Sequence, residues 1–318
     1  MNNIHITAST DLVTTPAARR SGFLEYALRR NKESIPFIDR AKALKAVLEV
    51  HTQSPNDLLT LINIRESLLE ASGISVKAKA HLTESDKLGL LNDFIEKILL
   101  PSGKAYIDEV VYRYLLTSGD ALGGKMRNIV GSIAKEKLTR FIISQLQIAD
   151  TQFSYLDKKL RSTPGEQLGV EDIDTIKAIR WSNKNNQQRI LIFDTNVPPV
   201  KKNIDIVLLN DAIVTDAPKI QDLKKLLETT VHYLAIGELK GGIDPAGADE
   251  HWKTANSALG RARTAFAGKL PLLFVGAAIE QAMAGEIFSQ YQAGELANCA
   301  NLTSDDQLAA LCEWLVRL

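Results

Sequence analysis

The sequence predicts an α/β protein in which a mixed β-sheet flanked by helices follows a large helical N-terminal region. Apolar residues recur at three-to-four spacing through most of 21–180, which is the period of an amphipathic helix. From about residue 175 the pattern changes to short apolar runs separated by helical stretches, an order typical of a sheet covered by helices. We therefore divide the chain into a mainly helical region, 1–174, and an α/β region with a helical tail, 175–318.

Start and stop signals bound the helices of the first region. Ser54 precedes a proline at the first helical position, and Thr83 opens a later helix. Glycines within 118–128 predict a break in the helical pattern there. The predicted helices are 22–30, 40–52, 55–71, 83–100, 105–117 and a last one ending near 148.

The second region alternates strands and helices. Residues 176–181 alternate like a half-exposed strand, and 189–194 form a short apolar strand. A strand follows at 203–209, another ends near Glu238, and a further one covers 271–276. Helices are predicted at about 217–228, at 249–266 and from about 278 onward.

Composition excludes several classes of protein. Hydrophobic content of 45% and charged content of 24% are ordinary for a soluble globular chain. Cys299 and Cys312 have no CxxC partner or nearby histidine, so neither a disulfide framework nor a zinc site is expected. The N-terminus lacks the order of a signal peptide, and no apolar run reaches membrane-spanning length. We therefore expect a cytoplasmic protein.

The net charge of zero, taken alone, argues against nucleic-acid binding, because such proteins usually carry a basic excess. The charges are unevenly distributed, however, and a locally basic cleft remains open. The basic residues gather at Lys125, Arg127, Lys135, Lys137, Arg140, Lys158, Lys159, Arg161, Lys177, Arg180, Lys184, Arg189, Lys201 and Lys202.

Two acids and a lysine form the candidate catalytic set. Alternation places Glu238 and Lys240 on one face of a strand and Leu239 on the other. Asp205 opens a second apolar strand, from which its carboxylate can converge on the same point. Such a set can hold Mg²⁺ and activate water for phosphodiester hydrolysis, with the Leu239 carbonyl as a third ligand. Lys240 would position the water and offset charge on the phosphate.

Each residue also has a simpler interpretation. Asp205 could be a strand acid facing water, and a Glu-x-Lys pair often decorates an exposed sheet face. Asp211, at the far end of the same strand, is a rival for Asp205, although a turn explains it more simply. His251, at a predicted helix start, could accept a proton from the attacking water. A lone histidine there is more often structural.

Longer blocks around these residues resemble the AvaI/BsoBI family of type II restriction endonucleases, within the PD-(D/E)xK nuclease superfamily. The resemblance rests on 202–205, on the run 238–252 (ELKGGIDPAGADEHW) and on 119–128. It implies a restriction-endonuclease-like fold and Mg²⁺-dependent cutting of duplex DNA at C-Y-C-G-R-G with four-base 5′ overhangs. It also implies a homodimer whose helical regions wrap the duplex, and a cognate methyltransferase that protects host DNA.

The resemblance also implies roles for individual residues. Asp205, Glu238 and Lys240 would be catalytic, and His251 an auxiliary acid or base. The gap between Asp205 and Glu238 is longer than the family pattern, which keeps Asp211 open.

Base contacts are implied for Lys202, for Asp244 and for one of Lys77 and Lys79, since lysine donates to guanine and aspartate accepts from cytosine. Lys125 and Arg127, after the predicted bend, are candidates for phosphate contacts; solvated side chains at a helix start are the alternative.

Other functions were weighed against this one. The main alternative is a PD-(D/E)xK repair or recombination nuclease without sequence specificity. A DNA-binding protein with a degenerate site is disfavoured because all three catalytic residues are present. A hydrolase of small phosphate esters is disfavoured by the absence of His-rich metal clusters and by the large helical half.

Overall fold

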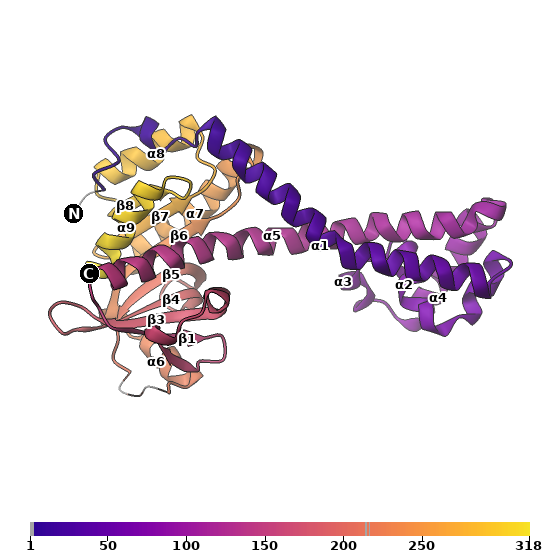
Figure 1. The fold of residues 1–318 in the computed structure, drawn as a ribbon, viewed down its shortest axis with the longest axis horizontal. Helices are drawn as coiled ribbons and strands as arrows, with labels where there is room; N and C mark the ends of the chain where they lie inside the picture. The colour runs from indigo at the N-terminus through magenta and orange to yellow at the C-terminus, as the bar shows by residue number, and fades with distance from the viewer. Residues whose placement is uncertain (1–2, 214, 216) are drawn as a thin grey trace. The chain divides into compact units, whose positions relative to one another are not determined.

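The computed structural model describes residues 3–213, 215 and 217–318. The chain forms two compact units: unit 1 comprises Met1–Phe23 and Ile129–Leu318, and unit 2 comprises Leu24–Asn128. Two long helices, α1 (Pro16–His51) and α5 (Tyr106–Ile148), contribute residues to both units (Figure 1).

Unit 2 is entirely helical in its regular structure. Its core consists of buried residues such as Leu48, Leu69, Leu99 and Tyr114. The capping signal at Thr83 is confirmed, since its hydroxyl accepts from the Asp86 amide at 3.2 Å. Between α1 and α5 lie 3₁₀ turns at Pro55–Thr60 and Ile62–Ile64, then α2 (Arg65–Ala71), α3 (Val76–Lys79), α4 (Glu84–Phe94) and a π-helical turn, Ile95–Leu99.

The predicted break at 118–128 is wrong, because α5 runs through it without interruption. A glycine inside a helix costs about 1 kcal/mol relative to alanine. Burial of Leu122 and Met126 within the same stretch offsets that cost. Likewise, the helices predicted at 22–30 and 40–52 are parts of the single helix α1.

Unit 1 contains a mixed eight-stranded sheet, as the sequence predicts. The strand order is β2-β1-β3-β4-β5-β6-β7-β8, antiparallel from β2 to β6 and parallel from β6 to β8 (Figure 1). The strands are β1 (Phe153–Asp157), β2 (Ser162–Pro164), β3 (Ile176–Ser182), β4 (Gln188–Val197), β5 (Lys202–Asn210), β6 (Tyr233–Lys240), β7 (Leu272–Gly276) and β8 (Asn298–Asn301). Strands β1, β2 and β8 were not predicted.

Helices cover both faces of this sheet. One core joins the sheet to α6 (Ile220–Glu228), α7 (Ala248–Ala265) and α8 (Gln281–Gln292). The other core joins it to the second half of α5 and to α9 (Asp305–Arg317). Such two-sided coverage explains why most central strand residues are buried.

The two ends of the strands define two edges of the sheet. We call the edge that holds Asp157, Ile176, Val197, Lys202 and Lys240 the site edge. The opposite end, which holds Ser182, Gln188, Asn210 and Tyr233, is the far edge. Register supports this division, since Lys202 lies opposite Val197 and Ser182 lies opposite Gln188.

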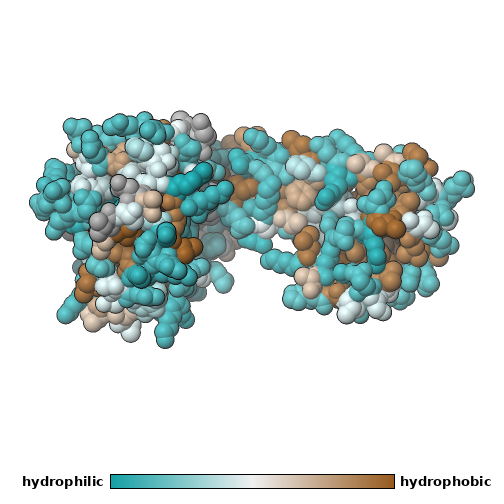
Figure 2. Space-filling view, turned by 90° about the horizontal axis from the view of Figure 1, so that it is seen from below, coloured by the Kyte–Doolittle hydropathy of each residue, from teal (hydrophilic) through white to brown (hydrophobic). Residues whose placement is uncertain are grey.

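Polar side chains cover most of the visible surface of both units, with apolar side chains interspersed (Figure 2). Within the described residues, no helix combines the length and apolarity that a bilayer crossing requires. The exposed large apolar residues include Leu24, Leu28, Ile35, Ile62, Val76, Leu116 and Ile148.

Candidate active site

Asp205, Glu238 and Lys240 meet at the site edge. The Lys240 ammonium lies 3.0 Å from Asp205 Oδ2 and 2.7 Å from Glu238 Oε2. One cation therefore bridges two carboxylates that come from neighbouring strands, as alternation along β6 predicts.

The strands separate at this point, which gives the carboxylates room. Pairing between β5 and β6 reaches Ile206 opposite Gly237 and goes no further toward the site edge. Beyond it, the Leu239 amide donates to Asp205 Oδ2 at 2.8 Å instead of to a strand carbonyl. The side chain of Asp205 thus satisfies a backbone donor that the ladder leaves open.

Both β5 and its neighbour β4 are irregular at Asp205. In β5, Ile204 and Ile206 are two residues apart, yet they belong to different cores, so the strand rotates about its axis between them. Asp194, which the register places opposite Asp205, has a φ of 48°. The Lys177 ammonium donates to the carbonyl of Asp194 at 2.8 Å and to the preceding carbonyl at 2.6 Å. No role in the site was predicted for Lys177 from the sequence. The feature that could have indicated one is a lysine within an otherwise apolar strand.

The electrostatics of the set favour a cation. The Glu238 side chain is 4% exposed, and its Oε1 atom has no hydrogen-bond partner among the residues that the structure describes. Burial, reinforced by repulsion from Asp205, raises the pKa of Glu238 to about 7, although Lys240 and Lys202 act in the opposite direction. Burial alone would lower the pKa of Lys240, but attraction to Glu238 and Asp205 outweighs it and raises that pKa. Lys240 is therefore a cation.

The donor set fits Mg²⁺. Oxygen donors and bound waters are what this ion prefers. Among the residues that the structure describes, no group of three or more His, Cys, Asp or Glu side chains could enclose a metal. The available oxygen donors are therefore the carboxylates of Asp205 and Glu238 and the Leu239 carbonyl. Glu238 Oε1, which has no partner among the described residues, is a buried acceptor that a cation would satisfy.

Asp211 does not lie at this site. It follows β5 at the far edge, where its Oδ2 accepts from Arg180 Nε at 2.6 Å and its Oδ1 accepts from the Ile213 amide at 2.9 Å. The side chain is 2% exposed. Both carboxylate oxygens are thus engaged in closing the chain after β5.

The segment after Lys240 carries two further candidates. His251 lies in the first turn of α7, exposed, with its ring against a glycine turn: a β-carbon at Gly242 would be 3.5 Å from Nε2, and one at Gly247 3.4 Å. Asp244 is exposed and accepts from the Ala246 amide at 2.9 Å, which caps a short 3₁₀ turn. Neither side chain contacts the catalytic set among the described residues.

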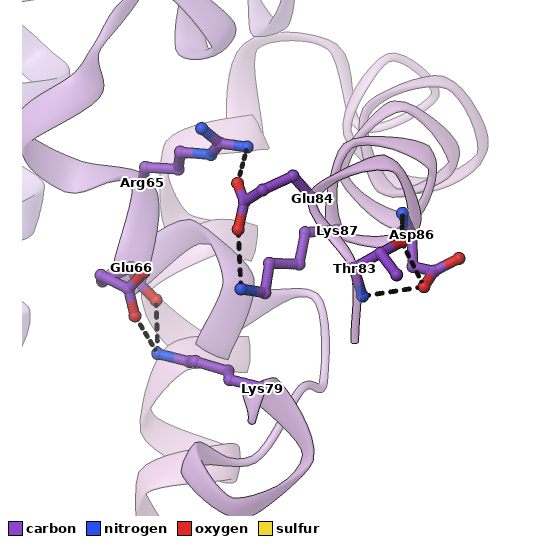
Figure 3. Close-up of polar contacts among 7 residues, drawn as sticks. All are labelled: Arg65, Glu66, Lys79, Thr83, Glu84, Asp86 and Lys87. Carbon is purple, nitrogen blue, oxygen red and sulfur yellow. Dashed lines mark hydrogen bonds and ion pairs between the residues drawn. The ribbon is translucent and has the colours of Figure 1, made fainter. Parts of the chain in front are cut away.

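In unit 2, the two candidate lysines of α3 differ sharply. Lys79 is 13% exposed and lies 2.7 Å from Glu66 Oε2 (Figure 3). It also lies 3.0 Å from Glu70 Oε1. Lys77 is exposed and has no ion-pair partner in the part of the chain that the structure describes. Lys77 therefore keeps its donors available, whereas Lys79 is engaged.

Lys125 and Arg127 are exposed side chains in the middle of α5. Lys125 is 2.7 Å from Glu33 Oε2. Because this stretch is helical, its amides bond within the helix and cannot approach a phosphate as a glycine bend would allow. Only the side chains remain candidates for phosphate contacts.

Known proteins match this chain over nearly its whole length. The sequence model of a family described as restriction endonuclease BsobI matches residues 2–318. The chain is 47% identical over 321 residues to the type II restriction enzyme BsoBI of Geobacillus stearothermophilus, covering 99% of this chain and 97% of that protein. It is 45% identical over 318 residues to the type II restriction enzyme AvaI of Anabaena variabilis, covering 99% and 98%.

Proposed function

The chain belongs to the BsoBI restriction endonuclease family and is a type II restriction endonuclease, and we propose that it hydrolyses both strands of duplex DNA at C-Y-C-G-R-G, leaving four-base 5′ overhangs. The observation that carries the chemistry is the meeting of Asp205, Glu238 and Lys240 at the site edge. We propose Mg²⁺ as the metal. A repair nuclease without sequence specificity is disfavoured, because the relatives of this chain are type II restriction enzymes.

We propose that Asp205, Glu238 and the Leu239 carbonyl hold Mg²⁺. The ion would supply Lewis-acid activation of the phosphate and of a bound water. Lys240, held by both carboxylates, is placed to orient the attacking water and to stabilise negative charge on the phosphate. Burial of Glu238 keeps the surroundings poorly solvated, which strengthens these interactions.

We propose that His251 assists proton transfer. Its ring rests on the glycine turn that directly follows Lys240, and it is exposed enough to exchange protons with solvent. A neutral imidazole near neutral pH can accept a proton from water.

For specificity we propose base contacts by Lys202, Asp244 and Lys77. The charge of Lys202 already acts on Glu238, which supports a place beside the catalytic set. Lys77 is preferred to Lys79 because its ammonium is unpaired among the described residues. Lys125 and Arg127 would contact phosphates. The Lys125 side chain is 48% exposed, and its partner Glu33 also pairs with Arg29, so Lys125 can turn to a phosphate without leaving Glu33 unpaired.

We propose that the enzyme acts as a homodimer, because a palindromic site presents two equivalent scissile bonds to a two-fold axis. The helical region, 1–174, would contact the duplex around the site. A methyltransferase that modifies the same sequence would protect the DNA of the host, in the cytoplasm of a prokaryotic cell.

Digestion of plasmid DNA of known sequence tests the proposal. Wild type and Glu238→Ala are compared with Mg²⁺ and with EDTA, and fragment ends are sequenced. Discrete Mg²⁺-dependent ends at C-Y-C-G-R-G, absent with Glu238→Ala, support it. Discrete ends at another sequence would leave the enzyme class intact and refute the proposed recognition sequence. Scattered ends would refute sequence specificity.

A further inference from the structure

A tight turn with two unpaired lysines lies between β1 and β2. In this site turn, 157–161, Asp157 Oδ1 accepts from the amides of Lys159 at 2.8 Å and Arg161 at 2.9 Å. Leu160 adopts a φ of 62°, and its amide donates to the Asp157 carbonyl at 2.9 Å. The buried Asp157 carboxylate therefore fixes the backbone that carries the lysines.

A second turn repeats this geometry between β3 and β4. In this far turn, 183–187, Asn183 Oδ1 accepts from the amides of Asn185 and Gln187, both at 3.0 Å. Asn186 has a φ of 58°, and its amide donates to the Asn183 carbonyl at 2.9 Å. Both are three-residue hairpin loops that end in a left-handed residue.

The two turns differ in charge. Lys158 and Lys159 occupy the positions that Lys184 and Asn185 hold in the far turn. Arg161 Nε lies 2.6 Å from Asp157 Oδ2, so that pair is neutral. Lys158 and Lys159 are exposed, and neither has an ion-pair partner in the described part of the chain. The far turn forms with a single lysine in place of two consecutive ones, so the turn geometry does not require a lysine pair.

The two turns also lie at opposite edges of the sheet. The site turn follows Asp157, which is opposite Ile176 at the site edge, whereas the far turn follows Ser182. Strands β1, β3, β4 and β5 are neighbours (Figure 1). Three strand spacings of about 4.8 Å separate β1 from the strand of Asp205, about 14 Å in all. This span corresponds to about four base pairs along a duplex.

We propose that the site turn binds the phosphate backbone of the DNA substrate through Lys158 and Lys159, about four base pairs from the scissile phosphate. The inference rests on the proposed function and adds a contact site to it. A backbone already fixed by Asp157 loses little conformational freedom on binding. Because phosphates carry no sequence information, the contact adds affinity and position rather than specificity.

The matched turns provide the experiment. The double variant Lys158→Gln with Lys159→Gln is compared with Lys184→Gln and wild type. Binding of a 30-base-pair duplex containing C-Y-C-G-R-G, about three helical turns long, is measured in EDTA from about 50 to 300 mM NaCl. The slope of log affinity against log salt should fall by about 1 per lost contact, hence by about 4 in the double variant, because the proposed homodimer loses two contacts in each protomer. The double variant should lose affinity for a scrambled duplex by the same factor as for the C-Y-C-G-R-G duplex. Lys184→Gln should match wild type on both duplexes.

Interference by phosphate ethylation locates the contact. Ethylation about four base pairs from the cut should weaken binding of wild type and of Lys184→Gln, but not of the double variant. Equal slopes for all three proteins, with wild type still cutting DNA, would overturn the inference alone. A wild type that neither binds nor cuts the duplex would instead overturn the proposed function. Thermal unfolding serves as the folding control, since these side chains are exposed.

Discussion

The two ends of β5 place an aspartate beside a cation in different surroundings. At the far edge, Asp211 is 2% exposed and matched by Arg180 at 2.6 Å. At the site edge, Asp205 is 29% exposed and lies 3.0 Å from Lys240, which also serves Glu238. Ion pairing by itself therefore does not mark the functional end.

What distinguishes the ends is the balance of charge and of hydrogen bonds. One carboxylate faces one guanidinium at the far edge, and both carboxylate oxygens have donors. Two carboxylates share the Lys240 ammonium at the site edge, and Glu238 Oε1 has no donor within the described part of the chain. With both acids ionised, the set of Asp205, Glu238 and Lys240 carries a net negative charge and a buried acceptor that a bound cation would satisfy.

The largest expected effect concerns cleavage. Glu238→Ala should lower the rate by about 10³-fold or more, because loss of this proposed metal ligand would remove several kcal/mol of transition-state stabilisation. Asp211→Asn should retain activity within about tenfold at a temperature where it is folded. Single-turnover cleavage of a defined duplex measures both. Loss of cleavage in folded Asp211→Asn would contradict the assignment of the two ends.

Stability should show the opposite order. Asp211→Ala leaves Arg180, whose side chain is 13% exposed, with two backbone carbonyl acceptors but without the carboxylate that it pairs with, and breaking such a buried pair costs about 3 kcal/mol. Asp205→Ala should cost less, since it also removes repulsion of Glu238. Urea unfolding in EDTA compares the two variants. Equal losses would show that Asp205 is as structural as Asp211.

The raised pKa of Glu238 predicts how the metal-free protein responds to pH. A carboxyl whose pKa rises from 4.5 to about 7 on folding stays protonated in the folded state while the unfolded chain ionises. The contribution of Glu238 to stability is therefore fully present below about pH 4.5 and falls until about pH 7, by on the order of 2–3 kcal/mol. Glu238→Gln should lack this fall. Unfolding free energies in EDTA from pH 4.5 to 8 test it, and parallel curves for the two proteins would refute it.

The proposed catalytic set could be identified in the sequence because its signals are local. Alternation around Glu238 and Lys240 needs only one strand, and Asp205 opens a clear apolar run. The sequence favoured Asp205 but kept Asp211 open, since one acid opens the apolar run and the other follows its end. That choice depends on the register of β5 and on Arg180, which lies 31 residues before Asp211.

The missed elements have the same explanation in tertiary contacts. Glycines at 118–128 predict a break, but burial of Leu122 and Met126 keeps α5 helical. β8 is buried along its whole length, so it shows neither alternation nor a long apolar run.

The same contrast between engaged and available charges extends to unit 2, with the smallest expected effect. Lys77→Ala should reduce discrimination between C-Y-C-G-R-G and duplexes with one substituted base pair by about 1–3 kcal/mol, the value of one good base contact. Lys79→Ala should leave discrimination unchanged and lower stability, because Glu66 and Glu70 lose their shared cation. Ratios of kcat/KM for the two kinds of duplex measure the first effect, and thermal unfolding measures the second. If Lys79→Ala lost discrimination while Lys77→Ala kept it, the engaged lysine would be the base reader, and an unpaired charge would no longer mark function in this chain.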